Sequence, residues 1–234
     1  MKVYYDFHIH SALSPCADKE NTPANIVNMA ALKGLSAIAI ADHNSAANCR
    51  PAIAMGKERG ITVVPAMELT TSEDTHILCL FEELSAAEEF ERHIRKGMLK
   101  VKNDKRIFGA QYVYGQGDEI IGEEEYLLSV ATAIPSHKAA RILEQFNGIA
   151  IPAHIDREAN GMLSILGFLD GMGFECVELS SSGKSLASKY SPDYNVLINS
   201  DAHCLGLISE AENALGIEGG LSPKSIISAI RRRF

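Results

Sequence analysis

The sequence predicts an α/β protein with the architecture of a parallel β/α barrel. Seven short apolar runs have the length of strands, and most are joined through segments with helical periodicity. Polar residues follow the ends of these runs. In a β/α barrel the loops after the strands build the active site, so we expect the functional side chains to gather at that end.

The composition is that of an ordinary globular protein. The chain has 234 residues, of which 46% are hydrophobic and 22% are charged, and this length suits one larger domain. We expect a single domain over residues 1–234, with an irregular insertion at about 107–137. The sequence shows no internal repeat that would suggest a solenoid.

The net charge and the cysteine content indicate which partners and which compartment to expect. The formal net charge of −8 argues against a protein whose main task is to grip long nucleic acid by its phosphates. A small phosphorylated ligand stays open, because a few cations in a cleft can reverse the local field. No apolar run is long enough to cross a bilayer, so we expect no membrane partner. Five cysteines without a C-x-x-C pair favour reduced thiols and a cytoplasmic protein. An oligomeric partner is left open.

The first apolar run, Val3 to Phe7, ends in a pair of histidines. His8 and His10 are two residues apart, and because a strand has a period of two, both imidazoles leave on the same side. Beside Asp6 they would form half of a divalent-metal site. The alternative is an edge strand with two solvated histidines, since His-x-His alone is weak evidence.

The next two predicted strands, 36–41 and 61–66, also deliver candidate ligands. The first leads into Asp42-His43 and the second into Met67-Glu68. A helix between the first and second strands begins at Thr22-Pro23, where threonine is a favoured N-cap and proline suits the first helical position. A further helix is expected over 46–59, closing at Gly60.

The fourth strand, 76–81, is expected to run antiparallel to the third. Only the short loop 69–75 separates it from Glu68, and a parallel crossover needs a longer connection, usually a helix. This arrangement would place His76 opposite Glu68.

The second half of the chain repeats the pattern of strands followed by polar residues. Helices are expected over 84–106, 123–134, 136–147 and 161–172, and from Ser222-Pro223 to a C-terminal triplet, Arg231–Arg233, that complements the helix dipole. Strands are expected over 149–153, 176–179 and 194–199, leading to His154, to Ser180–Ser182 and to Asp201-Ala202-His203. The basic part of 84–106 is either a solvated face or a rim that attracts phosphate.

Histidines and acids therefore collect at the ends of strands. Six of the eight histidines follow or begin an apolar run, namely His8, His10, His43, His76, His154 and His203. Three acids, Asp18, Glu68 and Asp201, occupy similar places. A ligand set of imidazoles and carboxylates that needs no thiolate suits zinc, manganese or iron(II).

The same residues carry a family resemblance that extends along the whole chain. The motifs are His8-Ile9-His10, Asp18 followed by Thr22-Pro23, Asp42-His43, Glu68, His76, Ala153-His154 and Ser200-Asp201-Ala202-His203. Together they resemble the PHP (polymerase and histidinol phosphatase) family. One departure is visible: the family commonly has a compact Ser-Asp-Gly after its first histidine pair, whereas here Ser14 to Asp18 is longer and Lys19 replaces the glycine. The spacing from Asp18 to Thr22-Pro23 keeps Asp18 among the expected ligands.

The resemblance implies a distorted seven-stranded, TIM-like β/α barrel with a cluster of two or three divalent ions (zinc, manganese or iron). Carried over by position, one ion would be held by His8, His10, Glu68 and Asp201. Glu68 would bridge to a second ion, completed by His76 and His154. A third would be held by Asp18, His43 and His203. A carboxylate can bridge two cations and a neutral imidazole cannot, which suits Glu68 to the central position.

Clustered divalent ions suit the hydrolysis of phosphate esters by an activated water, without a covalent nucleophile. Glu68 would hold the ions, Asp201 would take a proton from the attacking water, and His203 would donate one to the leaving group. Arg157 is the best-placed cation for a substrate phosphate, and an ordinary loop arginine is the alternative. Cys16 and Cys204 lie next to expected ligands but are interpreted as bystander thiols.

Three functions fit this site. The first is a phosphoesterase for a small phosphorylated substrate, either a phosphomonoester or a nucleotide. The second is a nuclease, which the acidic chain and the absence of an attached polymerase make less favoured. The third is a metal-binding module without catalysis, against which the complete ligand set argues.

Overall fold

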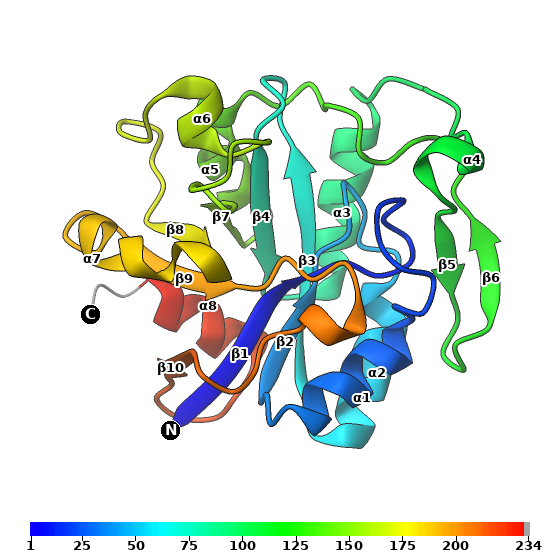
Figure 1. The fold of residues 1–234 in the computed structure, drawn as a ribbon, viewed down its shortest axis with the longest axis horizontal. Helices are drawn as coiled ribbons and strands as arrows, with labels where there is room; N and C mark the ends of the chain where they lie inside the picture. Colours follow the sequence, from blue (N-terminus) through cyan, green and yellow to red (C-terminus); the bar gives the residue numbers. More distant parts are fainter. Residues whose placement is uncertain (232–234) are drawn as a thin grey trace.

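The computed structural model describes residues 1–231. Arg232 and Arg233 of the predicted C-terminal triplet, together with Phe234, lie outside the described residues. A curled, half-barrel sheet of six strands forms the centre of the molecule (Figure 1). Its order is β10-β1-β2-β3-β4-β7. These strands are β1 (Lys2–Ile9), β2 (Ala37–Ile40), β3 (Thr62–Thr70), β4 (His76–Phe81), β7 (Gly148–Pro152) and β10 (Ala214–Gly216).

All seven expected strands are present, but they do not close into one regular barrel. β8 (Cys176–Ser180) and β9 (Asn195–Asn199) form a separate parallel pair. A single bridge between Ile9 and Ala202 connects the end of β1 to the chain that follows β9. The backbone N–H of Phe7 donates to the side-chain oxygen of Asn199 at 2.8 Å, so a side chain replaces a ladder bond where β1 passes β9. The expectation of a seven-stranded barrel is therefore corrected to a half-barrel sheet with an adjoining pair.

The expected antiparallel return after Glu68 is confirmed. β3 and β4 pair antiparallel, with Thr70 opposite His76 and Glu68 opposite Leu78. His76 is thus two pairs removed from Glu68 along the ladder rather than directly opposite it. Because residues two apart share a face of a strand, both side chains still project to the same side.

Two helices that the sequence predicted cover the face of the sheet beside β2. α1 (Pro23–Leu32) begins with Thr22, whose side-chain oxygen accepts from the N–H of Asn25 at 3.2 Å. α2 (Cys49–Arg59) starts three residues later than expected and ends at Gly60, which has a φ of 71°. That left-handed conformation is one that glycine adopts without a steric penalty.

The middle of the chain departs most from expectation. α3 (Leu84–Arg95) is shorter than the predicted 84–106, and α4 (Lys105–Phe108) and a hairpin of β5 (Tyr112–Tyr114) and β6 (Ile120–Glu123) follow it. The helix expected over 123–134 does not form. The buried amide of Gln111 instead donates to the carbonyls of Glu124 and Tyr126 and accepts from the N–H of Leu128 at 2.8 Å. These bonds satisfy backbone groups that a helix would otherwise pair internally.

The remaining elements lie between or after the last strands. These elements are α5 (Ser136–Glu144), α6 (Met162–Leu166), the 3-10 helices η1 (Ser181–Leu186) and η2 (Leu205–Leu207), α7 (Ala187–Tyr190) and α8 (Pro223–Arg231). The helix α8 packs against the inner face of the sheet. Val3, Tyr5 and Phe7 of β1 share one core cluster with isoleucines of α8. Among residues 1–231, no helix combines the length and apolar character needed to span a bilayer.

Candidate metal centre

A break in the register of β1 aims the first histidine pair. The ladder between β1 and β2 shifts between Asp6 and Ile9. Before the shift, Phe7 packs in the core with α8, whereas Ile9 packs in the cluster beside α1. A bulge of this kind reverses which alternate residues face inward, and it turns His8 and His10 toward the other strand ends. Their Nε2 atoms lie 3.2 Å apart.

The carboxylate of Glu68 lies at the centre of the histidines and is 1% exposed. Its Oε1 atom is 2.8 Å from Nδ1 of His76, 3.1 Å from Nε2 of His154 and 3.3 Å from Nε2 of His8. A single carboxylate oxygen thus has three imidazole nitrogens around it.

The second oxygen of Glu68 faces two further histidines. Oε2 is 2.9 Å from Nδ1 of His43 and 3.4 Å from Nε2 of His10. Among the described residues, Oε2 and Nδ1 of His43 are nevertheless buried without a partner in hydrogen-bond geometry. A buried polar atom without a partner costs about 1–3 kcal/mol, so the unpaired oxygen of Glu68 favours a bound cation beside it.

Asp201 completes a group with the first histidine pair. Its Oδ1 atom lies 3.0 Å from Nε2 of His10 and 3.5 Å from Nε2 of His8. Two donor atoms that each bind an ion at roughly 2.0–2.1 Å lie about 3 Å apart. Asp201 Oδ1 is also buried without a hydrogen-bond partner within residues 1–231. The spacing and the unpaired oxygen fit one divalent ion held by these residues and Glu68.

The charges in the cluster shift the pKa values of both acids downward. Burial works to raise the pKa of Glu68, but the imidazoles of His76 and His8 outweigh it and hold that pKa well below its ordinary value. Burial also opposes ionisation of Asp201, and His8 and His10 lower its pKa. Both carboxylates are therefore ionised near neutral pH, as metal ligands must be.

The pKa values of His10 and His43 shift in opposite directions. Burial, reinforced by repulsion from His203, lowers the pKa of His10 to about 3. For His43, burial alone would lower the pKa, but the Glu68 carboxylate and Cys16 raise it to about 9. His10 is therefore neutral and ready to bind an ion, while His43 must lose a proton first.

A supporting acid, Glu178 on β8, is a residue that the sequence reading missed. It is 1% exposed, and its two carboxylate oxygens lie 2.9 and 3.1 Å from Nδ1 of His8. It also accepts from Nδ2 of Asn199 at 2.7 Å and from the N–H of His154 at 3.0 Å. Carboxylates that hold the second nitrogen of a ligating histidine fix its orientation. A lone acid inside the apolar run Cys176–Ser180 was the available signal.

A second support holds His10. Nδ1 of His10 lies 2.8 Å from Oγ of Ser14, and this hydroxyl donates to Asp42 Oδ1 at 2.6 Å. Ser11 donates to the other oxygen of Asp42 at 2.6 Å. Asp42 thus fixes the loop after β1 through two hydroxyls, and burial raises its pKa despite these bonds.

The structure brings eight of the nine expected ligands to one place, and Asp18 is the exception. His10, His43 and His203 form one group of neighbouring nitrogens, and His43, Glu68 and His76 form another. The Asp18 side chain is exposed, and its Oδ1 accepts from the N–H of Glu20 at 3.1 Å. Its backbone N–H donates to the carbonyl of His203 at 2.8 Å.

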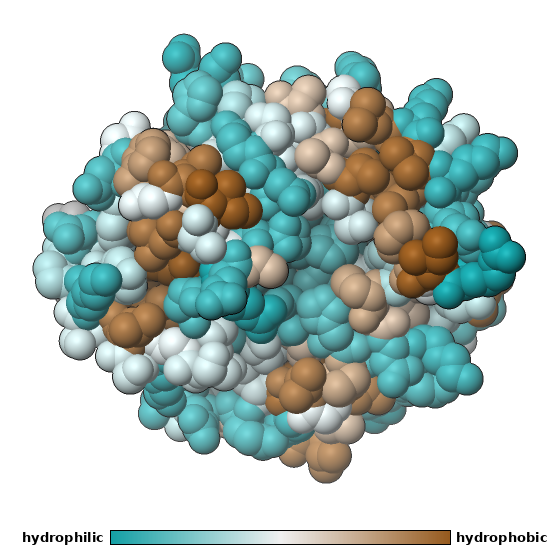
Figure 2. Space-filling model, turned by 45° about the horizontal axis from the view of Figure 1, so that its top comes forward, coloured by the Kyte–Doolittle hydropathy of each residue, from teal (hydrophilic) through white to brown (hydrophobic). Residues whose placement is uncertain are grey.

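Arg157 lies at the open side of the cluster. Its Nη1 atom donates to Oδ2 of Asp201, and its side chain remains 41% exposed. An arginine that is paired with a candidate ligand and also reaches solvent can contact a phosphate entering the site. Figure 2 shows a hydrophilic hollow near the middle of one face of the molecule, with apolar patches on both sides.

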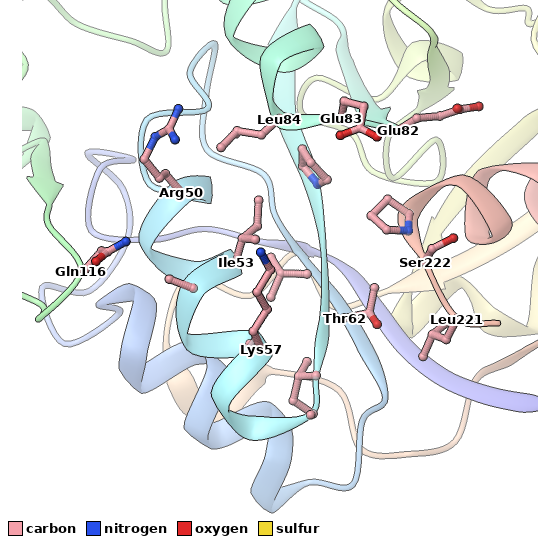
Figure 3. Close-up of a pocket in the computed structure, with 17 residues that line it drawn as sticks. Arg50, Ile53, Lys57, Thr62, Glu82, Glu83, Leu84, Gln116, Leu221 and Ser222 are labelled. Atoms are coloured by element: carbon pink, nitrogen blue, oxygen red, sulfur yellow. The ribbon is translucent and has the colours of Figure 1, made fainter.

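A separate groove lies away from these residues. It has a volume of about 700 Å³ and is lined by Arg50, Lys57, Thr62, Glu83 and Pro223, among others (Figure 3). Thr62 begins β3, whereas Glu68 lies near its end. The groove therefore occupies the opposite end of the sheet, and none of its lining residues is a candidate ligand.

Comparisons with known proteins agree with this fold. The model of the PHP domain family matches residues 6–155. Among curated proteins, no sequence matches this chain. The lesion-specific endonuclease PfuEndoQ from Pyrococcus furiosus is 18% identical, with a TM-score of 0.71 over 99% of this chain and 56% of that one. Endonuclease Q bound to a 27-mer duplex with an abasic lesion is also 18% identical, with a TM-score of 0.72 and coverages of 99% and 57%.

The chain therefore spans a little over half the length of these endonucleases. A chain from Bifidobacterium adolescentis, described as a candidate metal-dependent phosphoesterase, is 16% identical with a TM-score of 0.62, over 96% of this chain and 94% of that one. At such identities the structural likeness shows the fold alone. The family match covers more than half of the chain, and the chain belongs to the PHP domain family.

Proposed function

We propose that this chain is a metal-dependent phosphoesterase that hydrolyses small phosphate esters. The observation that carries the proposal is the position of Glu68, whose two oxygens have five imidazoles within 2.8–3.4 Å. A buried carboxylate can bridge two clustered cations, and the imidazoles around it can bind those cations once they are neutral. Membership of the PHP domain family supports the same chemistry.

The residues that would hold the ions follow from the groups of donor atoms. His8, His10, Asp201 and Glu68 would hold one ion, and Glu68, His76 and His154 a second. His43 and His203 would belong to a third. Bound divalent ions would neutralise the phosphate and make water acidic enough to attack near neutral pH.

The protein would supply the proton transfers and the orientation. Asp201 is ionised and can accept a proton from the attacking water at Oδ2, the oxygen that Arg157 contacts. Nδ1 of His203 lies 2.9 Å from the carbonyl of Asp201, and because a carbonyl only accepts, this nitrogen bears the hydrogen. Nε2 is therefore the nitrogen of His203 that carries a lone pair and that would bind the third ion.

The pairing of surface charges supports a small substrate. The basic segment 92–106 is the main run of cations in this acidic chain, yet four of its seven cations lie beside carboxylates. The pairs are Arg95 with Glu91 and Glu124, Lys102 with Glu125, Lys105 with Glu123, and Arg106 with Asp104. Binding to a long polyanion needs several free cations along a groove, whereas one phosphate needs only the metal cluster and an arginine.

A nuclease is the second candidate. The observation that favours it is the fold shared with endonuclease Q over 99% of this chain, since that enzyme binds duplex DNA with an abasic lesion. The test is elemental analysis of the purified chain, followed by hydrolysis assays on nucleotides, small phosphate monoesters and lesion-containing duplex. We expect two or three divalent ions per chain and release of phosphate from a small ester. At most one ion per chain after metal supplementation, or no hydrolysis of any phosphate ester, would overturn the proposal.

A further inference from the structure

The loop between β1 and α1 holds a thiol as well as the carboxylate of Asp18. Sγ of Cys16 lies 3.3 Å from Nε2 of His43. His43 is buried, with 6% of its surface exposed, and its other nitrogen faces Oε2 of Glu68 at 2.9 Å. With Nδ1 directed toward Glu68, Nε2 is the nitrogen that His43 can offer to an ion on the side of Cys16.

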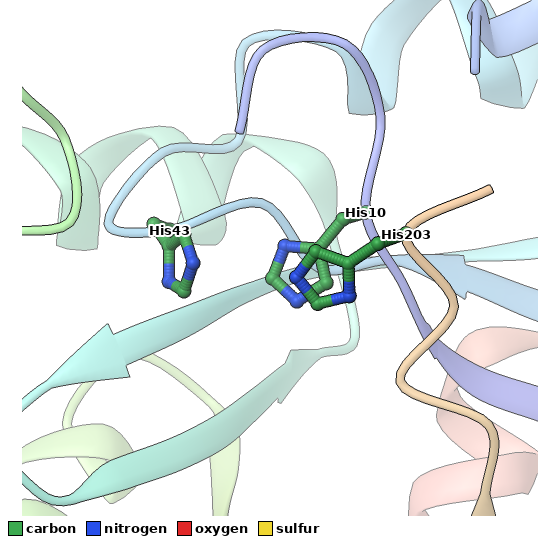
Figure 4. A group of neighbouring side chains, drawn as sticks. All are labelled: His10, His43 and His203. Atoms are coloured by element: carbon green, nitrogen blue, oxygen red, sulfur yellow. The ribbon is translucent and has the colours of Figure 1, made fainter. Parts of the chain in front are cut away.

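Two more imidazoles lie close to His43. His10, His43 and His203 each offer one nitrogen, and these three atoms lie within 4.8 Å of one another (Figure 4). The ring of His10 is 4.3 Å from that of His203 and 4.7 Å from that of His43, measured between centroids. His10 also serves the group of His8 and Asp201, so an ion bound by His43 and His203 needs a further ligand.

Asp18 does not fill this position, although its backbone helps to build it. Its carboxylate is exposed and closes a local turn by accepting from the N–H of Glu20. Its own N–H donates to the carbonyl of His203, which ties the loop to the chain after β9. Cys16 is exposed as well, but its Sγ contacts His43, whereas the Asp18 carboxylate accepts from Glu20.

We propose that Cys16, and not Asp18, joins His43 and His203 as the ligand of a third ion. On binding, the thiol gives its proton to solvent and the thiolate coordinates the ion. A soft thiolate with imidazoles selects zinc over the harder manganese ion. The inference rests on the metal centre of the proposed function and not on its substrate. The loop thus supplies a thiolate, whereas the other two ions would be held by carboxylates and imidazoles alone.

The test uses cobalt(II), which replaces zinc and gives an intense near-ultraviolet absorption when a thiolate binds it. The whole chain is stripped of metal and titrated with cobalt, as wild type and as Cys16→Ser, Asp18→Asn and Cys204→Ser. We expect the thiolate absorption in the wild type, its loss in Cys16→Ser, and its persistence in the other two variants. Cys204 follows His203 directly and is the matched control thiol.

Other outcomes contradict the proposal in distinguishable ways. A cobalt-loaded wild type without thiolate absorption, or loss of that absorption only in Cys204→Ser, would overturn the assignment of Cys16 and leave the cluster intact. A chain that binds no cobalt would overturn the metal centre as well. Retained absorption and ion count in Cys16→Ser, with an ion lost in Asp18→Asn, would restore Asp18 as the ligand.

Metal selectivity gives a second readout that does not depend on activity. Loss of a residue that merely supports a ligand costs about 10- to 100-fold in affinity, and loss of a ligand should cost at least as much. Cys16→Ser should therefore bind one zinc ion at least about tenfold more weakly. Cys16→Asp should regain the ion with a lower ratio of zinc to manganese, measured by elemental analysis after loading with both. An unchanged ratio would contradict the role of the thiolate.

Discussion

Glu68 is the residue on which the charge balance of the cluster depends. Both of its oxygens face imidazoles, and each of the first two proposed ions would use it. Glu68→Ala should remove a ligand from two ions and leave their charges repelling, so metal content should fall to at most one ion per chain and hydrolysis should be lost. Elemental analysis checks this, with the exposed Glu58→Ala as the control. Full metal content and activity in Glu68→Ala would rule out the bridging role.

Glu178 acts through His8 and is a positioning residue. Glu178→Gln keeps the shape but removes the charge that holds Nδ1 of His8, so metal affinity should fall by about 10- to 100-fold while the fold persists. Chelator competition measures the affinity and circular dichroism the fold. The matched control is Glu175→Gln, three residues earlier and exposed, which should match the wild type. Equal affinity in both variants would show that the contact is not needed.

The raised pKa of His43 predicts how metal binding depends on pH. Its pKa in the folded, metal-free chain is about 9, above the ordinary value of 6.5. Its contribution to the stability of the metal-free chain is therefore complete below pH 6.5 and is lost as the pH rises through 9. Since only neutral His43 binds an ion, zinc affinity should tighten over the same window, by up to about tenfold per pH unit.

Chelator competition at about pH 6.5 and about pH 8.5 tests this dependence. The variant His137→Gln changes an exposed histidine of α5 and should keep the same profile. An affinity that is constant across the window would show that no protonated ligand has to be deprotonated on binding.

Among the elements, α1 depends on a cap that also anchors the hairpin. Thr22 accepts from the N–H of Asn25 and donates to Asp118, which lies between β5 and β6. Thr22→Ala should lower the free energy of unfolding by about 1 kcal/mol, the usual cost of losing an N-cap. Urea unfolding of the metal-free chain measures it, because bound metal would add to the stability. Thr22→Ser keeps the oxygen and should restore most of the loss.

β1 is the element that decides whether the first histidine pair belongs to the site. A strict alternation from Val3 would have placed His8 and Phe7 on opposite faces throughout. The shift between Asp6 and Ile9 allows Phe7 to pack in the core while His8 and His10 turn toward Glu68. The bulge thus lets one short strand serve both the core and the metal centre.

At the scale of the whole molecule, net charge predicts the size of the substrate. The charge of −8 disfavours a polyanion, and four of the seven cations of the basic segment are paired with carboxylates. We expect faster turnover of a nucleoside monophosphate or a small phosphate monoester than of a long duplex, at matched metal and salt. Initial rates across these substrates check the prediction. Faster cleavage of the duplex than of every small phosphate would favour the nuclease.

The sequence by itself determined the seven expected strands along the chain and the local signals around them. Period-two histidines, apolar runs, the Thr22-Pro23 start and the short loop before His76 predicted elements that the structure contains. These features depend on neighbouring residues, so a single chain reveals them. The predicted helices over 84–106 and 123–134 were too long or wrong because helical periodicity does not report a distant partner such as Gln111.

Only the tertiary structure decided how the strands closed and which side chains met. The half-barrel meets the separate β8-β9 pair where the N–H of Phe7 donates to Asn199, 192 residues away in the sequence. Glu178 joins His8 across 170 residues, and no local pattern encodes that pairing. Asp18 and Cys16 lie two residues apart, yet the fold turns the carboxylate to solvent and the thiol to His43. Contacts between distant segments set these directions, and sequence spacing alone does not contain them.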